Sequence, residues 1–251
     1  MSELNEAQRN KLAARLAMKV DRSDSGQLLP ATAAALALGA TEGAVARLEA
    51  LAQALRDERV IVPINVEADP RETGVHANID PGSCDAADFA RVTIDGRDAL
   101  VAYSSAIELA TSRPGARPMT LPFQKVALTA LVETGGRVVI NPGADAVLMP
   151  RSCVAALAQG DQWLPAWRDE ELLAQLRERC EGVPAGRALR ELRVVPAQEG
   201  TLVRVEILID REILASVGDP RQSVTELVTA LQGAQRLIAA GDRIELVPLP
   251  V

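Results

Sequence analysis

The chain has 251 residues, of which 48% are hydrophobic and 24% are charged, and this composition excludes collagen-like, low-complexity and wholly disordered proteins. Lys and Arg number 27 against 34 for Asp and Glu, so the formal net charge of −7 argues against nucleic acid as a partner. One His and three Cys leave few side chains for proton transfer or metal binding, and we expect no metal and no cofactor. The length fits two domains.

The beginning of the chain is expected to be a loose N-terminal arm, residues 1–27. Residues 3–20 favour a helix but have a weak apolar stripe, and the DRSDSG segment at 21–26 breaks the pattern. The apolar run at 31–40 is shorter than the roughly 20 residues of a bilayer-spanning helix. The sequence therefore predicts no contact with a membrane.

Cysteine usage and the absence of a signal-peptide pattern indicate the compartment. Cys84, Cys153 and Cys180 form an odd and widely spaced set, which is typical of free thiols in a reducing environment. Charged residues interrupt the first 20 positions, so no apolar export segment is present there. We expect a cytoplasmic protein.

The first domain is predicted over residues 28–160. A helix follows Thr41, because apolar residues recur at helical spacing from Val45 to Leu55. The β-branched run Arg59–Val66 is typical of a buried strand, with an unpaired edge at Pro63, which has no N–H to donate.

Turn chemistry places the remaining elements of this domain. Asp95-Gly96 between two β-rich runs predicts a hairpin with a type I′ turn, and Ser105 with Glu108 predicts a capped helix that ends before Pro114. The pattern then predicts a helix over 123–131, a hairpin-like pair at 138–140 and 146–149, and a helix from Pro150 to Gly160.

A linker is predicted over 161–187, followed by a second domain over 188–251. The latter begins with a hairpin of 189–196 and 201–210, whose valines and isoleucines alternate onto one face. One long helix, striped from Val224 to Ile238, and a last strand at 243–247 complete it. The expected fold class is α+β: a mixed sheet with hairpins and flanking helices, followed by a smaller ββαβ-type domain.

Few side chains offer a reactive pattern. His76 and Cys84 share the polar loop 67–88, and a thiolate beside an imidazole suggests a Cys-dependent enzyme, although a solvated loop His explains the same residues. Asp80, Asp85 and Asp88 do not match a calcium loop, and no dinucleotide, P-loop or serine-hydrolase motif occurs. We therefore expect no catalytic residues and no enzymatic activity.

Trp163 and Trp167 are the two tryptophans of the chain, and exposed aromatic residues of this kind favour protein contacts. They are our candidate partner-binding residues, with burial of both in the seam between the two domains as the alternative. Asp169 and Glu170, at the expected start of a helix, oppose its dipole rather than perform acid–base chemistry. The basic residues Lys11, Arg15 and Lys19 are expected to form a solvated face.

Several short motifs of turns and packing give the chain a resemblance to the bacterial SseB family over about residues 30–167. They are Tyr103-Ser104-Ser105, Ala116-Arg117-Pro118, the segment Val138 to Pro142, Val147-Leu148-Met149-Pro150, Ala155-Ala156-Leu157-Ala158-Gln159-Gly160 and Trp163-Leu164-Pro165. The tail looks like the smaller C-terminal domain of many members. In one respect the chain departs from the family pattern, because it has no aromatic residue near Thr111 and Ser112.

The resemblance implies a link to serine sensitivity but supplies no catalytic residues. Together with the residues it predicts a non-enzymatic accessory or regulatory protein that binds a protein or a small metabolite. Self-association is left open. Alternatives are a small-molecule sensor with a pocket between the domains or beneath the 67–88 loop, and an enzyme that uses Cys84 with His76.

Overall fold

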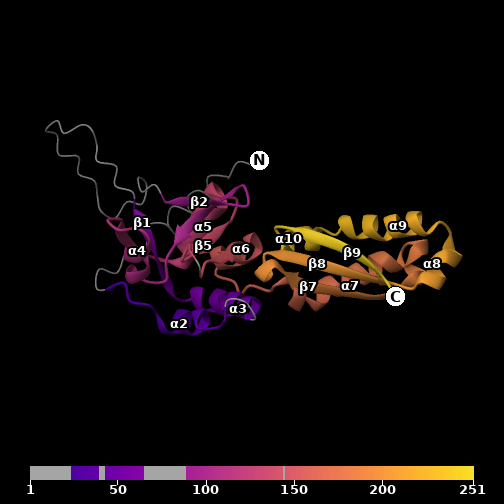
Figure 1. Ribbon diagram of the computed structural model, residues 1–251, viewed down its shortest axis with the longest axis horizontal. Coiled ribbons are helices and arrows are strands. Elements are labelled where there is room, and N and C mark those ends of the chain that lie inside the picture. The colour runs from indigo at the N-terminus through magenta and orange to yellow at the C-terminus, as the bar shows by residue number, and fades with distance from the viewer. Residues whose placement is uncertain (1–23, 40–42, 65–88, 144) are drawn as a thin grey trace, which may run out of the picture. The chain divides into compact units, whose positions relative to one another are not determined.

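The computed structural model describes residues 24–39, 43–64, 89–143 and 145–251 (Figure 1). Helices are interspersed with three small sheets, two of them mixed, so the predicted α+β class is confirmed. Most of the predicted N-terminal arm lies outside the described residues. Its last residues are held in place, because Asp24 forms an ion pair with Arg59 and Gly26 accepts a backbone hydrogen bond from Ala106.

Contacts divide the described residues into two compact units. The first takes those within 1–38, 50–149 and 154–162, and the second takes those within 39–49, 150–153 and 163–251. The sequence analysis placed the change of domain at a linker. Instead, the second unit also takes in two short earlier pieces, from the start of helix α3 (Ala44–Leu55) and the start of helix α6 (Arg151–Gln159).

Two sheets form the first unit. A four-stranded sheet has the order β2 (Arg91–Ile94), β3 (Arg97–Ala102), β5 (Val138–Ile140) and β6 (Val147–Met149), in which β3 and β5 are parallel and the outer pairs are antiparallel. Strand β1 (Arg59–Ile64) pairs antiparallel with β4 (Arg117–Pro122). Ile61 also exchanges two backbone hydrogen bonds with Tyr103, just after β3.

The hairpin predicted around Asp95-Gly96 is confirmed. Asp95 has φ +53° and Gly96 has φ +72°, the two positive values that a type I′ turn requires. Arg137 stabilises the turn, because its Nη1 donates to the carbonyl oxygens of Ile94 and Arg97 at 3.0 and 3.1 Å. The turn is therefore fixed twice: by local chemistry at its two central residues and by one distant guanidinium at the two residues that flank them.

Helices α2 (Pro30–Leu36), α4 (Ala106–Ser112) and α5 (Phe123–Glu133) complete this unit together with the end of α6. Ser105 caps α4 as predicted, since its Oγ accepts from the backbone N–H of Glu108 at 3.2 Å. Ser112 Oγ, at the end of this helix, lies 3.0 Å from the hydroxyl of Tyr103 and forms a hydrogen bond with it. Helix α2 and strand β4 were not predicted.

The second unit is built on the sheet β7 (Leu189–Ala197), β8 (Leu202–Ile209) and β9 (Ile244–Pro250). The predicted β7–β8 hairpin is confirmed, and β9 adds parallel to β8. Helices α7 (Glu170–Glu181), α8 (Arg211–Val217), α9 (Pro220–Gln232) and α10 (Gln235–Ala240) surround one core with it. In Figure 1, α9 runs alongside the strands.

Two expectations for this unit need correction. Residues 161–187 were predicted as a linker that contains the start of a helix. That helix, α7, has Leu172, Leu176 and Cys180 buried in the core of the second unit, so the segment is part of this unit and does not merely connect two domains. The single long helix is wrong as well. The stripe from Val224 to Ile238 belongs to two helices, α9 and α10, separated at Gly233-Ala234, and α8 precedes them. The helical spacing of apolar residues did not reveal the break between the two helices, because this spacing continues across it.

Prolines occupy the two outer edges of this sheet. The N–H of Val203 bonds to Arg243 and the N–H of Val251 bonds to Ile209, so the backbone of Pro248 and Pro250 points away from β8. By the same alternation, Pro196 of β7 lies at a position that bonds no residue of β8. No ladder hydrogen bond is lost at these three prolines.

Candidate functional site

The candidate site is the segment Trp163 to Asp169, which carries both predicted partner-binding residues. It runs from Trp163 through Pro165 into the short 3₁₀ helix η2 (Ala166–Arg168). The two indole rings meet edge to face, with centroids 5.7 Å apart and an angle of 89° between the planes. Such pairs are the favoured aromatic geometry, so each tryptophan positions the other.

Each indole N–H has a partner within the second unit. Nε1 of Trp163 donates to Ser152 Oγ at 3.3 Å, and Nε1 of Trp167 donates to Glu49 Oε1 at 2.6 Å. The carboxylate of Glu49 also accepts from Arg168, at 3.4 Å for each of two guanidinium nitrogens. One carboxylate thus connects the start of α3 to two side chains of the segment.

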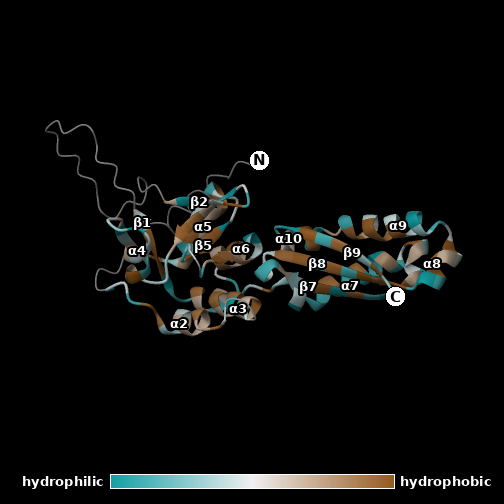
Figure 2. Ribbon diagram, viewed as in Figure 1, coloured by the Kyte–Doolittle hydropathy of each residue, from teal (hydrophilic) through white to brown (hydrophobic). Residues whose placement is uncertain are grey.

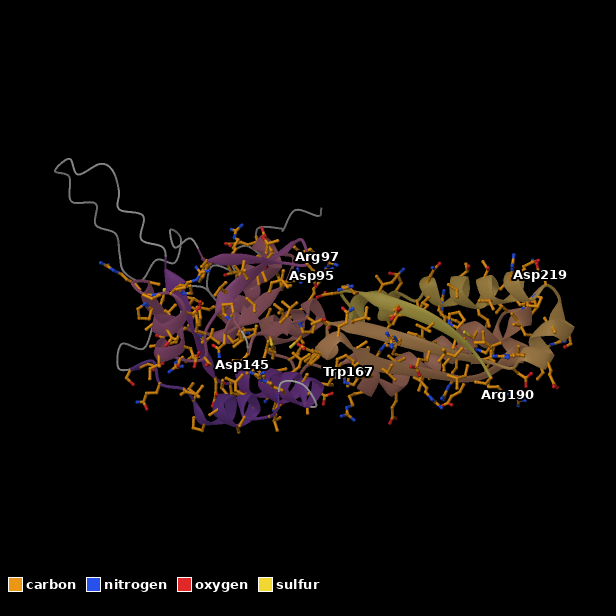
Figure 3. All side chains as sticks on the ribbon, viewed as in Figure 1. Asp95, Arg97, Asp145, Trp167, Arg190 and Asp219 are labelled. Carbon is orange, nitrogen blue, oxygen red and sulfur yellow. The ribbon has the colours of Figure 1, made fainter. Side chains whose placement is uncertain are left out.

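Gly200, at the β7–β8 turn, makes room for this arrangement. Its φ is +86°, and a Cβ there would lie 2.6 Å from Leu48 Cδ2 and 3.3 Å from the ring of Trp167. Both the backbone conformation and the available space therefore require glycine. Figure 3 labels Trp167 near this end of the hairpin and Arg190 near the other end.

Asp169 closes the segment and begins α7. Its Oδ1 accepts from the backbone N–H of Leu172 at 3.0 Å, while Arg236 donates to both carboxylate oxygens at 2.7 and 3.0 Å. Burial raises the pKa of Asp169, but the hydrogen bonds from Arg236 and Leu172 and the charge of Arg236 outweigh it and hold this pKa below its ordinary value. The predicted acidic helix start is confirmed, and Asp169 acts there as a cap.

The interpretation of the two tryptophans as exposed aromatics needs correction. Trp163 is 9% exposed, and Trp167 is partly buried against the core of the second unit. Leu164, which lies between them, is 54% exposed, and the side chain of Arg168 is 65% exposed. The tryptophans hold the segment in place, and Leu164 and Arg168 are the side chains that it presents to solvent.

Other candidate residues fall outside the described part of the chain. These are His76 and Cys84 with their loop 67–88, its acidic residues Asp80, Asp85 and Asp88, and the basic residues Lys11, Arg15 and Lys19. The Cys-dependent enzyme stays a prediction. Cys153 and Cys180 are described and are buried free thiols. Burial raises the pKa of Cys153 well above its ordinary value and, as the largest influence, raises that of Cys180 to about 11.

The sequence analysis missed the partners that fix the segment: Glu49, Ser152, Gly200 and Arg236. Two of these are distant in the sequence, with Glu49 118 positions from Trp167 and Arg236 67 positions from Asp169. The available signal was Gly200, since a glycine at the end of a predicted hairpin indicates either a positive φ or a close approach. It did not indicate which side chain approaches.

Within the residues that the structure describes, no three His, Cys, Asp or Glu side chains gather as metal ligands do. None of the helices described is both long and apolar enough to cross a bilayer.

Comparison with known families addresses the first unit most directly. Residues 33–156, from within α2 to within α6, match the SseB protein N-terminal domain. The chain belongs to the SseB family. The candidate segment lies just beyond the matched SseB domain, and an SseB C-terminal domain over 188–251 stays a prediction. No curated protein and no solved structure matches the chain.

Proposed function

We propose that this SseB-family protein is a non-enzymatic accessory or regulatory protein of the cytoplasm that acts by binding a protein. A small metabolite is the alternative ligand, and the role is linked to serine sensitivity. The segment Trp163 to Asp169 is the proposed binding site.

The observation that carries this proposal is the firmly held segment Trp163 to Asp169, which exposes Leu164 and Arg168.

The directions of the displaced pKa values among the described residues agree with this proposal. The carboxyls of Asp24, Asp169 and Asp210 have lowered pKa values, with hydrogen bonds from arginines or backbone N–H groups among the causes. Burial keeps the thiols of Cys153 and Cys180 protonated. A general acid needs a raised carboxyl pKa and a nucleophilic thiol a lowered one, so these groups support a structural use of the charges.

The segment suits a protein partner because its backbone is held in place and an apolar side chain is exposed to solvent. The paired tryptophans and Asp169 fix the backbone from within the second unit, and Leu164 projects an exposed apolar side chain beside the charged Arg168. Ordering such a segment on binding costs little conformational entropy, because its backbone is already held.

Capture from a native bacterial lysate tests the proposal. We expect the wild-type chain to retain a partner and Leu164→Asp to lose it, because a carboxylate replaces the exposed apolar contact. Ile238→Asp is the matched control, since Ile238 is 50% exposed elsewhere in the second unit. Equal loss in both variants, or retention by Leu164→Asp, contradicts the site. If the wild type retains nothing, the protein-partner proposal fails.

The metabolite alternative has a separate test. Amino acids and sulfur metabolites are screened for an increase in Tm, which ligand binding to the folded state produces by mass action. An increase with one compound that Leu164→Asp abolishes favours a metabolite at this segment. No increase with any compound removes the alternative.

The enzyme hypothesis at Cys84 is tested by iodoacetamide labelling of the folded chain. Cys153 and Cys180 serve as slow internal references, because both are buried with raised pKa values. A Cys84 thiol that reacts much faster than free cysteine at neutral pH supports a thiolate nucleophile. Ordinary reactivity ends that hypothesis.

A further inference from the structure

A short segment ahead of α2, residues 24–28, lies against the first turn of α4. The carbonyl oxygen of Gly26 accepts a hydrogen bond from the backbone N–H of Ala106 at 2.8 Å. A Cβ on Gly26 would lie 2.7 Å from the Cβ of Ala106, and the φ of Gly26 is +76°, so this close approach requires glycine. In Figure 1 the segment is the indigo coil that leads into α2. We call residues 24–28 the strap.

The guanidinium of Arg59, at the start of β1, binds the strap. Its Nε donates to Oδ2 of Asp24 at 2.5 Å and its Nη2 donates to Oδ1 at 2.9 Å, so one edge of the guanidinium binds both carboxylate oxygens. Nη2 also donates to the carbonyl oxygen of Gln27. Two parallel N–H groups against two oxygens are the arrangement with which arginine recognises carboxylates in general.

Arg59 has a second anchor, which does not depend on the strap. Its Nη1 donates to the carbonyl oxygen of Ser104 at 3.3 Å. Ser104 is 2% exposed, and its backbone N–H and its Oγ both bond to the side-chain amide of Asn141, each at 2.9 Å. The guanidinium therefore keeps a fixed partner when Asp24 is absent, and its Nε and Nη2 can bind another carboxylate.

This anchor lies where the two parallel strands of the four-stranded sheet end. Ser104 comes two residues after β3 and Asn141 comes directly after β5, and these strands are parallel. Strand β5 is hydrophobic throughout (Figure 2), so the polar side chains begin just beyond its last residue. In open sheets with parallel strands, small molecules bind beyond the carboxyl ends of the strands. Arg59 and the strap occupy that position in the first unit.

Polar contacts hold the strap in place. Its hydrogen bonds run to Arg59 and Ala106, while its one apolar residue besides glycine, Leu28, is 44% exposed. A ligand that offers Arg59 the same polar contacts can displace such a segment, because little buried apolar surface is lost when it leaves.

Helix α2, which follows the strap, is held separately. The carboxylate of Glu58 accepts from the backbone N–H groups of Ala31 and Thr32 at 3.0 and 2.8 Å, and also from Thr32 Oγ1 at 2.6 Å. The strap can therefore leave Arg59 while α2 stays in place. The same bonds occupy the carboxylate of Glu58, so Asp24 is the carboxylate that a ligand has to replace.

We infer that Arg59 is a binding site for the carboxylate of a small molecule, and that Asp24 of the strap occupies this site until such a ligand replaces it. The internal carboxylate indicates the chemistry of the ligand, which is a planar pair of oxygens on a narrow carbon chain. Because the ligand competes with a tethered carboxylate, its apparent dissociation constant is the intrinsic one divided by the fraction of molecules with an open strap. The site lies in the first unit and does not depend on the tryptophan segment.

Acetate is the probe, because it has the same carboxylate group as an aspartate side chain. The Tm of the full chain is measured against acetate concentration, with sodium chloride holding the ionic strength constant. Asp24→Ala frees Arg59, so we expect its apparent dissociation constant for acetate to be at least about tenfold lower than that of the wild type. Acetamide has nearly the same shape without the charge and should not raise the Tm.

Two further variants test whether Arg59 is the group that binds acetate. Arg59→Gln in the Asp24→Ala background should abolish the rise in Tm, because the amide lacks both the charge and the paired donors. Glu133→Ala is the matched control: it removes the carboxylate partner of Arg91, whose side chain is 42% exposed against 11% for Arg59. Screening by water should leave this control without a measurable rise.

Movement of the strap has a readout of its own. The N–H of Ala106 bonds to Gly26, so hydrogen exchange of this amide in the wild type should become faster as acetate is added. An ion pair that served stability alone would give no such change. Gly26→Ala keeps Asp24 and Arg59 but hinders the closed position through a strained φ and the contact with Ala106, and it should bind acetate more tightly than the wild type.

The inference is overturned by any of three results: no rise in Tm for Asp24→Ala with acetate, an equal rise with acetamide or in Glu133→Ala, or unchanged exchange at Ala106. Inorganic phosphate that raises the Tm more than acetate does would overturn the assignment of a carboxylate. Circular dichroism confirms that the variants are folded, and Gly26→Ala carries the same test with the ion pair intact. Leu164→Asp should leave acetate binding unchanged, so failure of this inference and failure of the proposed function are distinguishable.

Discussion

The sheet of the first unit and the sheet of the second unit bury their strands in different ways. Strand β3 from Ala99 onward and strand β5 are apolar and buried on both faces: Ala99 and Val101 belong to one core cluster, and Leu100 and Val138 are equally inaccessible. Strand β8 alternates, with Val205 and Ile207 inside and Arg204 and Glu206 outside. A continuous apolar run therefore marks a strand enclosed by other elements, whereas alternation marks a strand with one face left for solvent or a partner.

The largest effect expected from this difference is at adjacent residues of β8. Ile207→Ala removes a fully buried side chain and should lower the free energy of unfolding by about 2–5 kcal/mol. Leu208→Ala, on the face of β8 that points away from the core, should lower it by about 1 kcal/mol or less. Urea unfolding followed by tryptophan fluorescence measures both, because Trp163 and Trp167 lie in the second unit.

The matched pair in the first unit is Val138→Ala and Val139→Ala in β5. Both valines are fully buried, so we expect similar losses of roughly 2 kcal/mol, at about 0.8 kcal/mol for each buried methyl or methylene group. Circular dichroism follows these variants. Unequal losses in β5, or equal losses in β8, would show that the two sheets do not differ as described.

Each unit has a turn glycine with a positive φ, and replacing each by alanine compares the two turns. Gly200→Ala introduces a strained φ and places a methyl group against Leu48 and Trp167, for an expected loss of about 2–4 kcal/mol. Gly96 has a similar positive φ, but no atom lies near its added methyl group, so Gly96→Ala should lower the free energy of unfolding by about 1 kcal/mol. Thermal unfolding compares them. A smaller loss at Gly200 than at Gly96 would mean that the contact with Trp167 has room to relax.

One ion pair in each unit offers a test of how acid lowers stability. The lowered pKa of Asp169 means that its contribution is complete above the ordinary pKa of an aspartate and is lost as pH falls through the lowered value. Asp169→Asn keeps a capping oxygen but removes the carboxyl that titrates. We therefore expect a Tm that falls less steeply as the pH is lowered. Asp24→Asn is the counterpart in the first unit, where a hydrogen bond from Arg59 lowers the pKa. Unchanged acid slopes would contradict both assignments.

The smallest effect is expected at exposed ion pairs. Arg204→Ala beside Glu245 in the second unit and Arg91→Ala beside Glu133 in the first unit should each change the free energy of unfolding by under about 1 kcal/mol. Urea unfolding measures both. A larger loss for Arg204→Ala would show that this arginine contributes more than an exposed ion pair does.

Local chemistry made much of the fold predictable. Asp95-Gly96 specified its turn because two adjacent positive φ values suit few residues, and Ser105 specified a cap because its hydroxyl reaches an N–H three residues ahead. The alternation of apolar and polar residues in β8 could also be recognised, because successive side chains of a strand point to opposite faces. These signals lie within a few residues of the structure that they determine.

What could not be predicted depends on distant partners. Strand β4 contains Pro118 and Pro122, which disguise it because proline is compatible with a strand only where the neighbour does not need its N–H. Helix α7 looked like a connection because its burial is decided by β7 and α9, which follow it. For the candidate site, both tryptophans were identified, but their burial depends on Glu49 and Ser152 from earlier helices.

The prolines at the borders of the last sheet limit how the protein aggregates. A strand border that offers evenly spaced N–H and C=O groups can recruit the same strand from one molecule after another, which is how fibrils elongate. Pro196, Pro248 and Pro250 interrupt that row on both borders. Strand-by-strand growth from this sheet is thereby hindered when molecules of this chain are crowded together.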